Sequence, residues 1–150
     1  MLRMFDPDQR FQKIFLDRFL EGHIACVVSM DDQPVHVAWI AFTQLWIDES
    51  KWSLQLAPST CCIYNVETLP QFRRQGIYSE VLLCIAEWWW KKGGTTITIY
   101  ADMKNRPSIL GILNAGFRPA GEMRCWIAFN KFVFSRPMDL RIGNVIGTIV

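Results

Sequence analysis

The sequence predicts an α/β fold with a mixed β-sheet, and two observations support this. A strand-like run at residues 61–66 is followed by a helical stretch at 77–92 and an alternating run at 95–101. Strand, helix and strand in this order form a βαβ unit, whose two strands are parallel neighbours with a right-handed crossover. Nearer the N-terminus, two β-rich runs separated by turn residues predict an antiparallel hairpin.

The size and composition of the chain fit one folded domain over residues 1–150. The chain is 51% hydrophobic and 20% charged, with a formal net charge of +2. A chain of this length buries roughly 70% of its unfolded surface, so its core requires neither a metal ion nor disulfides. The small net charge gives no reason to expect a nucleic-acid partner. No uncharged apolar stretch reaches the ~18 residues that span a bilayer.

The first elements are a helix and the hairpin. Residues 7–20 carry apolar side chains at helical spacing, and Asp6 or Asp8 is a plausible N-cap. Arg18 lies beside this apolar stripe, where its stem can pack while its charge reaches water. The β-rich runs at 24–30 and 35–42 then flank a typical turn sequence. The stripe consists of Phe11, Ile14, Phe15 and Phe19, and the turn consists of Asp31, Asp32, Gln33 and Pro34.

The helix at 77–92 ends at Gly93 and Gly94, which are typical of a helix C-terminus. Its apolar stripe, predicted to pack on the sheet, consists of Ile77, Val81, Cys84, Ile85 and Trp88. The three consecutive tryptophans at 88–90 cannot share one face, because successive helical residues point about 100° apart. Leu83 and Trp90 are predicted to face outward. Another part of the chain covers this outward surface, or it forms a homodimer contact.

The connection that leads into this helix is a candidate phosphate-binding site. The first N–H groups of a helix have no intrahelical partner, and together with the helix dipole they attract anions. Gly76 has no Cβ and so permits close approach of a ligand. Arg73 and Arg74 supply positive charge and planar donors suited to phosphate. A surface turn with two solvated arginines is the alternative.

Two motifs on the βαβ unit give the sequence a family resemblance. Residues 68–79 resemble motif A of the GNAT acetyltransferases, in which Arg/Gln-x-x-Gly-x-Gly/Ala follows a strand. The segments 105–109 and 114–117 are similar to motif B, which runs from Asn-x-x-Ser/Ala-Ile to a Gly-Phe pair. The resemblance implies a GNAT-like fold, a mixed and mostly antiparallel sheet with a central parallel pair flanked by helices.

The resemblance also implies a cofactor and the residues that bind it. In the family, backbone amides of motif A hold the pyrophosphate of acetyl-CoA, a role that falls on residues 74–79 here. Asn105 corresponds to a residue near the pantetheine arm, although helix capping is the alternative for it. The implied cofactor-binding residues are Val66, Thr68, Arg73, Arg74, Gln75, Gly76, Ile77, Tyr78, Ser79 and Asn105.

The implied activity is acetyl transfer to the amine of a small molecule or a peptide. A backbone N–H at Val66 or Thr68 polarises the thioester carbonyl in this interpretation. Glu67 is the nearest carboxylate and the candidate general base. Members that use a glutamate on this strand often carry it nearer the position of Tyr64. A solvent-facing charge at the strand end is therefore the alternative for Glu67.

Two positions depart from the family pattern. Tyr78 replaces a small residue in the phosphate loop, so its ring must be accommodated there or point away. Ile112 stands where many members carry a tyrosine that protonates the leaving thiolate. Tyr100 and Cys125 are weaker candidates for that donor. The alternative function is therefore a non-catalytic acyl-CoA-binding or interaction protein on the same fold.

The cysteines and histidines predict neither a metal site nor a disulfide framework. The five cysteines are odd in number and form no Cys-x-x-Cys pair. With only His23 and His36 available, no zinc spacing can be assembled, and packing or surface roles are expected for both. We expect buried, reduced thiols in a cytoplasmic protein, since no secretory signal is visible.

Overall fold

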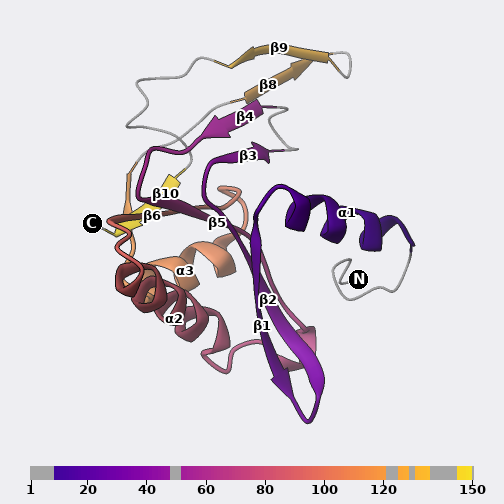
Figure 1. Ribbon diagram of the computed structural model, residues 1–150, viewed down its shortest axis with the longest axis vertical. Helices are drawn as coiled ribbons and strands as arrows, with labels where there is room; N and C mark the ends of the chain where they lie inside the picture. Colours follow the sequence, from indigo (N-terminus) through magenta and orange to yellow (C-terminus); the bar gives the residue numbers. More distant parts are fainter. Residues whose placement is uncertain (1–8, 48–51, 121–124, 129–130, 136–144, 150) are drawn as a thin grey trace.

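The computed structural model describes residues 9–47, 52–120, 125–128, 131–135 and 145–149 (Figure 1). In chain order the elements are α1 (Gln9–Leu20), β1 (Ile24–Met30), β2 (Gln33–Ala41), β3 (Gln44–Ile47), β4 (Trp52–Gln55), β5 (Thr60–Thr68), the short 3-10 helix η2 (Pro70–Phe72), α2 (Ile77–Lys91), β6 (Thr96–Tyr100), α3 (Arg106–Asn114), β7 (Arg118–Pro119), β8 (Cys125–Ala128), β9 (Lys131–Ser135) and β10 (Val145–Ile149).

Six strands form the main sheet in the order β1-β2-β5-β6-β10-β7. Only β5 and β6 are parallel, and the other neighbours in this sheet are antiparallel. The helices α2 and α3 lie on one side of the sheet and α1 lies on the other (Figure 1). The predicted α/β class and its mixed, mostly antiparallel sheet are therefore confirmed. Two hairpins, β3–β4 and β8–β9, form separate two-stranded sheets.

The predicted N-terminal hairpin is present as β1 and β2. Asp31 and Asp32 connect the strands with φ values of 48° and 60°. Positive φ at both central residues is the geometry of a type I′ turn, whose twist matches that of the flanking strands. The predicted helix caps Asp6 and Asp8 lie outside the described residues.

Each face of the sheet carries its own apolar core. On one face, α2 and α3 cover β-strand residues that include Ile63, Ile97 and Ile99. On the other face, Trp39 and Tyr64 belong to a second core, against which Phe15 of α1 packs. The strand β5 therefore separates two differently built environments, because alternate side chains of a strand point to opposite faces.

The position of Cys84 corrects the predicted stripe of α2. The buried residues of this helix are Val81, Leu82, Ile85 and Ala86. Because Leu82 and Ala86 complete this face, its centre is rotated away from Cys84, which is exposed. The expectation that the thiols are buried is correct for Cys61 and Cys62 and wrong for Cys84. Leu83 and Trp90 are 45% and 44% exposed, as predicted.

Only part of the predicted α1 stripe is buried. The ring of Phe15 contacts Trp39 edge-on at 5.0 Å, whereas Phe19 also reaches Trp39 but remains 53% exposed. Ile14 is 36% exposed, so this helix packs through a narrow seam rather than a broad face. Arg18 lies beside the stripe as predicted and is half-buried, but its charged end does not simply reach water: the guanidinium carbon lies 4.8 Å from the Trp39 ring centroid and 5.1 Å from that of Tyr64.

Candidate functional site

The parallel strands β5 and β6 separate before β5 ends. Their pairing runs from Thr60 opposite Thr96 to Ile63 opposite Ile99. Beyond Ile63, β5 continues to Thr68 beside β2 alone among the described strands. Ligands of α/β sheets bind at the carboxyl ends of such strands, where neighbouring connections diverge. The segment from 64 to 68 therefore forms one wall of the candidate site.

A β-bulge lies within this segment. Asn65 has a φ of 45°, and the β2–β5 register shifts there, so that Asn65 and Val66 face the single residue Ala38. A bulge inserts one extra residue into a strand and bends it locally. Val66 packs against the core beneath α2. The bend and the loss of the β6 pairing coincide, which explains why the two strands part at this point.

The bulge also decides which face Glu67 occupies. Tyr64 lies opposite Trp39 and Glu67 lies opposite Val37, and both β2 residues belong to the core on the α1 face. Residues directly opposite one another project to the same face of a sheet. Tyr64 and Glu67 therefore share the α1 face although they are three residues apart. Glu67 is half-buried there rather than fully solvated.

The connection from β5 into α2 presents an uncapped helix start. Gly76 caps α2 with a φ of 80° and provides no side-chain hydrogen bond to the helix. The first bond into the helix runs from the Glu80 N–H to the Gly76 carbonyl at 3.1 Å, which leaves the N–H groups of Ile77, Tyr78 and Ser79 at the helix start. A Cβ added at Gly76 would meet no atom within 4 Å. The space above this helix start is therefore open to an anion.

The two loop arginines differ in their surroundings. The Arg73 side chain turns back, and its Nε donates to the Thr68 carbonyl at 2.9 Å. This bond ties the loop to the end of β5. Arg74 is exposed and has a φ of 62°, which places it in the left-handed region just before the helix. Gln75 donates from Nε2 to the Gln71 carbonyl at 3.2 Å, which closes the loop upon itself.

The side chains of Tyr78 and Ser79 point toward α3. The Tyr78 hydroxyl lies 2.8 Å from the Ser108 hydroxyl, and the Ser79 hydroxyl donates to the Gly111 carbonyl at 3.1 Å. The Tyr78 ring covers Gly111 so closely that a Cβ there would lie 2.7 Å from it. The ring that replaces a small residue in the motif is thus turned away from the loop. These side chains join the two helices and leave backbone N–H groups at the helix start.

A buried histidine supports this side of the site. His36 is fully buried, and its Nδ1 lies 2.7 Å from the Thr68 hydroxyl. The Tyr78 ring stands edge-on to it at 6.2 Å. Its Nε2 has no hydrogen-bond partner among the described residues. Burial lowers the pKa of His36 to about 4, so the imidazole is neutral near pH 7. His36 thereby joins β2 to the strand end that holds Arg73.

Asn105 and Ile112 have structural roles in α3. The Asn105 side-chain oxygen accepts a hydrogen bond from the Ser108 N–H at 3.3 Å and caps the helix. Asn105 therefore caps α3, which was the alternative role considered for it. Its contact with the cofactor stays a prediction. Ile112 is fully buried in the core under α2 and α3. No titratable group occupies the place of the family's proton donor.

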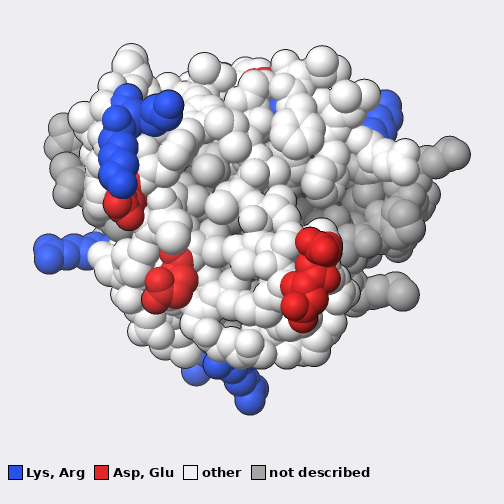
Figure 2. Space-filling view, turned by 60° about the horizontal axis from the view of Figure 1, so that its bottom comes forward, with Lys and Arg blue, Asp and Glu red and all other residues white. Residues whose placement is uncertain are grey.

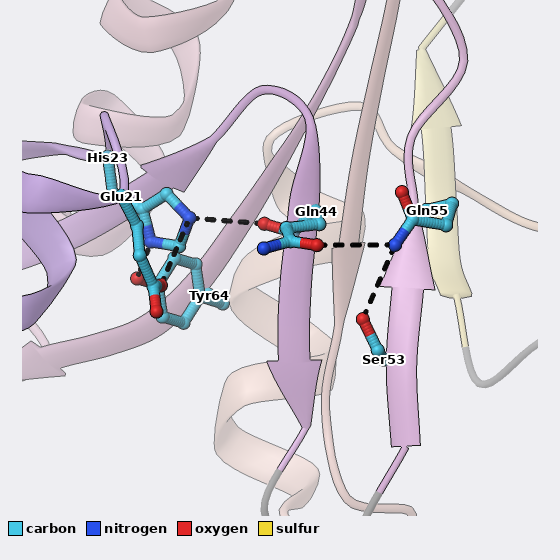
Figure 3. Close-up of polar contacts among 6 residues, drawn as sticks. All are labelled: Glu21, His23, Gln44, Ser53, Gln55 and Tyr64. Carbon is cyan, nitrogen blue, oxygen red and sulfur yellow. Dashed lines mark hydrogen bonds and ion pairs between the residues drawn. The ribbon is translucent and has the colours of Figure 1, made fainter.

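On the α1 face, His23 and Tyr64 form a hydrogen-bonded pair (Figure 3). The two side chains meet at 2.6 Å between Nδ1 and the hydroxyl oxygen, and His23 Nε2 lies 3.1 Å from the Gln44 carbonyl. A carbonyl only accepts, so Nε2 carries the proton and the Tyr64 hydroxyl donates to Nδ1. The Glu21 carboxylate lies 3.8 Å from the same Nε2. Burial raises the pKa of Tyr64.

Sequence reasoning missed this pair. His23 and Tyr64 are 41 residues apart, and no local pattern joins them. The packing role expected for His23 is correct as far as its burial goes, but it omits the hydrogen bonds to β5 and β3. In the sequence, His23 and Gln44 are polar residues at the starts of β-rich segments. This pattern alone is too weak to predict that they meet.

Comparison with models of known protein families identifies the family of this chain. The model of the acetyltransferase (GNAT) family matches residues 2–110. The chain belongs to this acetyltransferase family. The resemblance inferred from the two motifs is therefore confirmed. No curated protein sequence matches the chain significantly.

Solved structures of GNAT acetyltransferases have a similar fold. The apo aminoglycoside 6'-N-acetyltransferase AAC(6')-IG from Acinetobacter haemolyticus matches with a TM-score of 0.59 and 15% identity, over 87% of this chain and 85% of that one. AAC(6')-Ib in complex with ribostamycin and coenzyme A matches with a TM-score of 0.63 and 15% identity, over 79% and 68%. A candidate ribosomal-protein-serine acetyltransferase from Vibrio cholerae matches with a TM-score of 0.63 and 12% identity, over 97% and 76%.

None of the described helices combines the length and the apolar character needed to cross a membrane. Within the same residues, no three His, Cys, Asp or Glu side chains gather in a group that could hold a metal ion.

Proposed function

We propose that this GNAT family member is an acetyl-CoA-dependent N-acetyltransferase that moves an acetyl group to an amine. One observation carries the proposal: α2 starts uncapped with open space above Gly76, and its Tyr78 ring packs against His36, which bonds to Thr68 at the end of the β5 segment that has lost its β6 neighbour. An anion at the helix start and a thioester at the strand ends are the two parts of acetyl-CoA that such a site must hold. Coenzyme A in the AAC(6')-Ib structure supports this cofactor class.

In this proposal the pyrophosphate binds at residues 74–79 through backbone N–H groups. The exposed Arg74 adds charge to the phosphates, whereas Arg73 holds the loop through its bond to Thr68. The pantetheine arm then runs along β5 toward Val66, with Asn105 at the opposite side of the opening. This path uses the segment of β5 that has lost its β6 neighbour, where backbone groups can pair with amides of the arm.

The chemical step requires an amine base and a polarised thioester. An N–H of Val66 or Thr68 donates to the thioester oxygen, which becomes negative as the amine nitrogen attacks the carbonyl carbon. Glu67 accepts the proton that the amine loses, directly or through water. The acyl carbon then releases coenzyme A as a thiolate, which takes up a proton. Because Glu67 faces α1, the acceptor approaches from that face, opposite the side that carries α2.

The acceptor class remains broad within this proposal. A small-molecule amine is supported by the aminoglycoside acetyltransferases of similar fold, one of which holds ribostamycin. A peptide amine is the other class inferred from the sequence. The cytoplasmic location inferred there also stays a prediction.

A second candidate function is a non-catalytic acyl-CoA-binding protein, and buried Ile112 favours it. A thiolate leaving group requires a proton, and this position offers none. Tyr100, half-buried at the end of β6, is the described candidate for another donor. The side chain of Cys125 lies outside the described residues.

Thiol release from acetyl-CoA over a panel of amines separates the two functions. The transferase predicts release above the rate without amine, together with an acetylated product in mass spectrometry. Binding without release, detected as a thermal shift, favours the binder, since a ligand at 100 times its Kd stabilises by about 2.7 kcal/mol. The absence of both release and shift would contradict both functions.

A further inference from the structure

The proposed reaction leaves one proton of the acceptor amine without a destination. An aliphatic amine is an ammonium ion near pH 7, since its pKa is about 10. Its nitrogen therefore loses two protons as the amide bond forms, and the leaving thiolate takes up only one of them. Glu67 is a single carboxylate and holds one proton at a time. The other proton needs a second group on the α1 face.

The chain has two histidines, and only His23 is suited to this task. His36 contacts Tyr78 on the α2 face, and burial lowers its pKa to about 4, so it takes up no proton near pH 7. On the face shown in Figure 2, the described acidic side chains lie apart from one another, so no cluster of carboxylates there shares a proton. His23 is the histidine on the α1 face, where it bonds to Tyr64.

Tyr64 connects His23 to the neighbourhood of Glu67. The Tyr64 hydroxyl donates to His23 Nδ1 at 2.6 Å (Figure 3). The partners of Tyr64 and Glu67 on β2 are two residues apart, so these two side chains are neighbours on the α1 face. Tyr64 and His23 are only 3% and 4% exposed. A proton that reaches the Tyr64 oxygen can therefore move on to His23 without passing through bulk water.

The surroundings of His23 contain two oxygen atoms that attract a positive ring. Its Nε2–H donates to the Gln44 carbonyl at 3.1 Å, and the Glu21 carboxylate lies 3.8 Å from the same nitrogen (Figure 3). An imidazolium ion formed here keeps the Nε2–H bond and lies beside a negative charge. A proton that arrives at Nδ1 therefore changes none of the contacts on the other side of the ring.

Tyr64 passes a proton on only as it receives one. Burial raises the pKa of Tyr64 well above its ordinary value, so the phenol stays protonated. The charge of Arg18 on α1 lowers this pKa, whereas Glu21 and Cys62 raise it. The Tyr64 oxygen therefore accepts a proton while its own hydroxyl proton leaves for the imidazole.

We propose, on the basis of the transferase function above, that His23 stores one proton of the acceptor amine, which reaches it through Glu67 and Tyr64. Glu67 takes the first proton from the ammonium ion and passes it to the Tyr64 oxygen, as the Tyr64 hydroxyl proton moves to Nδ1. Glu67 is then a carboxylate again and takes the second proton, which it gives to the coenzyme A thiolate. After the product leaves, the imidazolium ion returns its proton to water along the same path. The thiolate is thus protonated although Ile112 offers no donor.

H23Q separates proton storage from hydrogen bonding. Glutamine can accept from the Tyr64 hydroxyl and donate to the Gln44 carbonyl, but it takes up no proton near pH 7. With the aliphatic amine that the wild type acetylates fastest, kcat of H23Q at pH 7 is expected to fall by about tenfold. The defect should shrink as the pH approaches the pKa of the amine, because a neutral amine loses only one proton. Imidazole added to the buffer should restore the rate at pH 7.

Two further variants complete the test. Y64F breaks the path at the hydroxyl and is expected to show the same pH-dependent defect, and acetyl-CoA titration checks the fold of both variants. Q55A is the matched control, because exposed Gln55 donates to the side-chain oxygen of Gln44 and not to its carbonyl, so kcat should stay unchanged.

The wild type separates the two levels of the proposal. No turnover of any amine by the wild type would contradict the transferase function itself, and proton storage with it. Turnover by the wild type together with an H23Q defect that is absent, independent of pH or unrelieved by imidazole would overturn proton storage alone.

Discussion

The two buried histidines of the chain show how differently the faces of β5 are built. Both histidines bond through Nδ1 to a hydroxyl on β5, His36 to Thr68 and His23 to Tyr64. On the α2 face, His36 Nε2 has no partner among the described residues. On the α1 face, His23 Nε2 lies within reach of the Gln44 carbonyl and 3.8 Å from the Glu21 carboxylate. The second ring nitrogen of His36 therefore has no described partner, whereas that of His23 has a polar connection to the exposed Glu21.

This difference matches the two tasks of the proposed enzyme. A cofactor that every turnover uses is held best by a rigid, preorganised loop, which the His36–Thr68–Arg73 connection provides. The acceptor side must admit an amine and release a proton, and it carries Glu67 and the His23–Tyr64 pair. Changing one residue on each face should therefore affect one task and leave the other intact.

The largest effect is expected at Glu67. E67Q keeps the size of the side chain but removes the base, so kcat should fall by roughly 10²- to 10⁴-fold. The Kd of acetyl-CoA should stay within about twofold, because the carboxylate faces α1 and not the phosphate loop. Steady-state kinetics and calorimetry measure the two quantities. An unchanged kcat would show that Glu67 is not the base but only a charge at the end of the strand, the alternative stated for it from the sequence.

Acid should destabilise the protein through His36. Burial lowers the pKa of His36 to about 4 in the folded protein from its ordinary value of 6.5, so only the unfolded chain binds the proton between these values. Stability should therefore fall as the pH drops from about 6.5 to about 4, by about 3 kcal/mol from this residue. Urea unfolding at several pH values in this range measures how the free energy of unfolding changes with pH.

H36Q and H23Q provide the matched pair for this prediction. In H36Q, the part of the acid-induced loss of unfolding free energy that comes from His36 should be absent. H23Q keeps His36 and should therefore show that loss. An identical slope in wild type and H36Q would show that the imidazole is protonated as easily in the folded protein as in the unfolded chain.

The smallest effects are expected from removing single hydroxyl groups on the two faces. Y64F leaves His23 Nδ1 without its donor in a buried place, and should cost about 1–3 kcal/mol of unfolding free energy. Y78F loses the bond to Ser108 in a half-buried place, and should cost about 1 kcal/mol. In kinetics, Y64F should raise the KM of the acceptor and Y78F the KM of acetyl-CoA. The reverse pattern would contradict the assignment of the faces.

The sequence predicted local elements and motifs better than contacts between distant residues. The hairpin at 24–42 and the βαβ unit follow from periodicity and turn residues, which act over a few positions. The phosphate loop was found because its residues are contiguous. The β-bulge at Asn65 was not predicted, since it depends on the pairing with β2, and it determines that Glu67 shares a face with Tyr64.

Side-chain directions were the other part that the sequence left open. The exposure of Cys84 depends on the rotation of α2 about its axis, which neighbouring elements set. The direction of Tyr78 depends on Gly111, a small residue 33 positions away that makes room for the ring. The bonds of His23 join three elements from separate parts of the chain. Each of these contacts is created by tertiary packing and leaves no local pattern.

The central claim, that the start of α2 binds the phosphates of acetyl-CoA, is tested most directly by two matched glycine variants. Gly76 and Gly93 have φ values of 80° and 84°, and both face open space, but they lie at opposite ends of α2. G76D and G93D therefore introduce the same backbone strain and the same charge at different places.

Calorimetric titration with acetyl-CoA gives the readout for this pair. The account predicts that G93D binds within about twofold of wild type and that G76D binds at least about 100-fold more weakly, a loss of about 2.7 kcal/mol. Equal binding by G76D and G93D, or no binding by the wild-type chain, would contradict it.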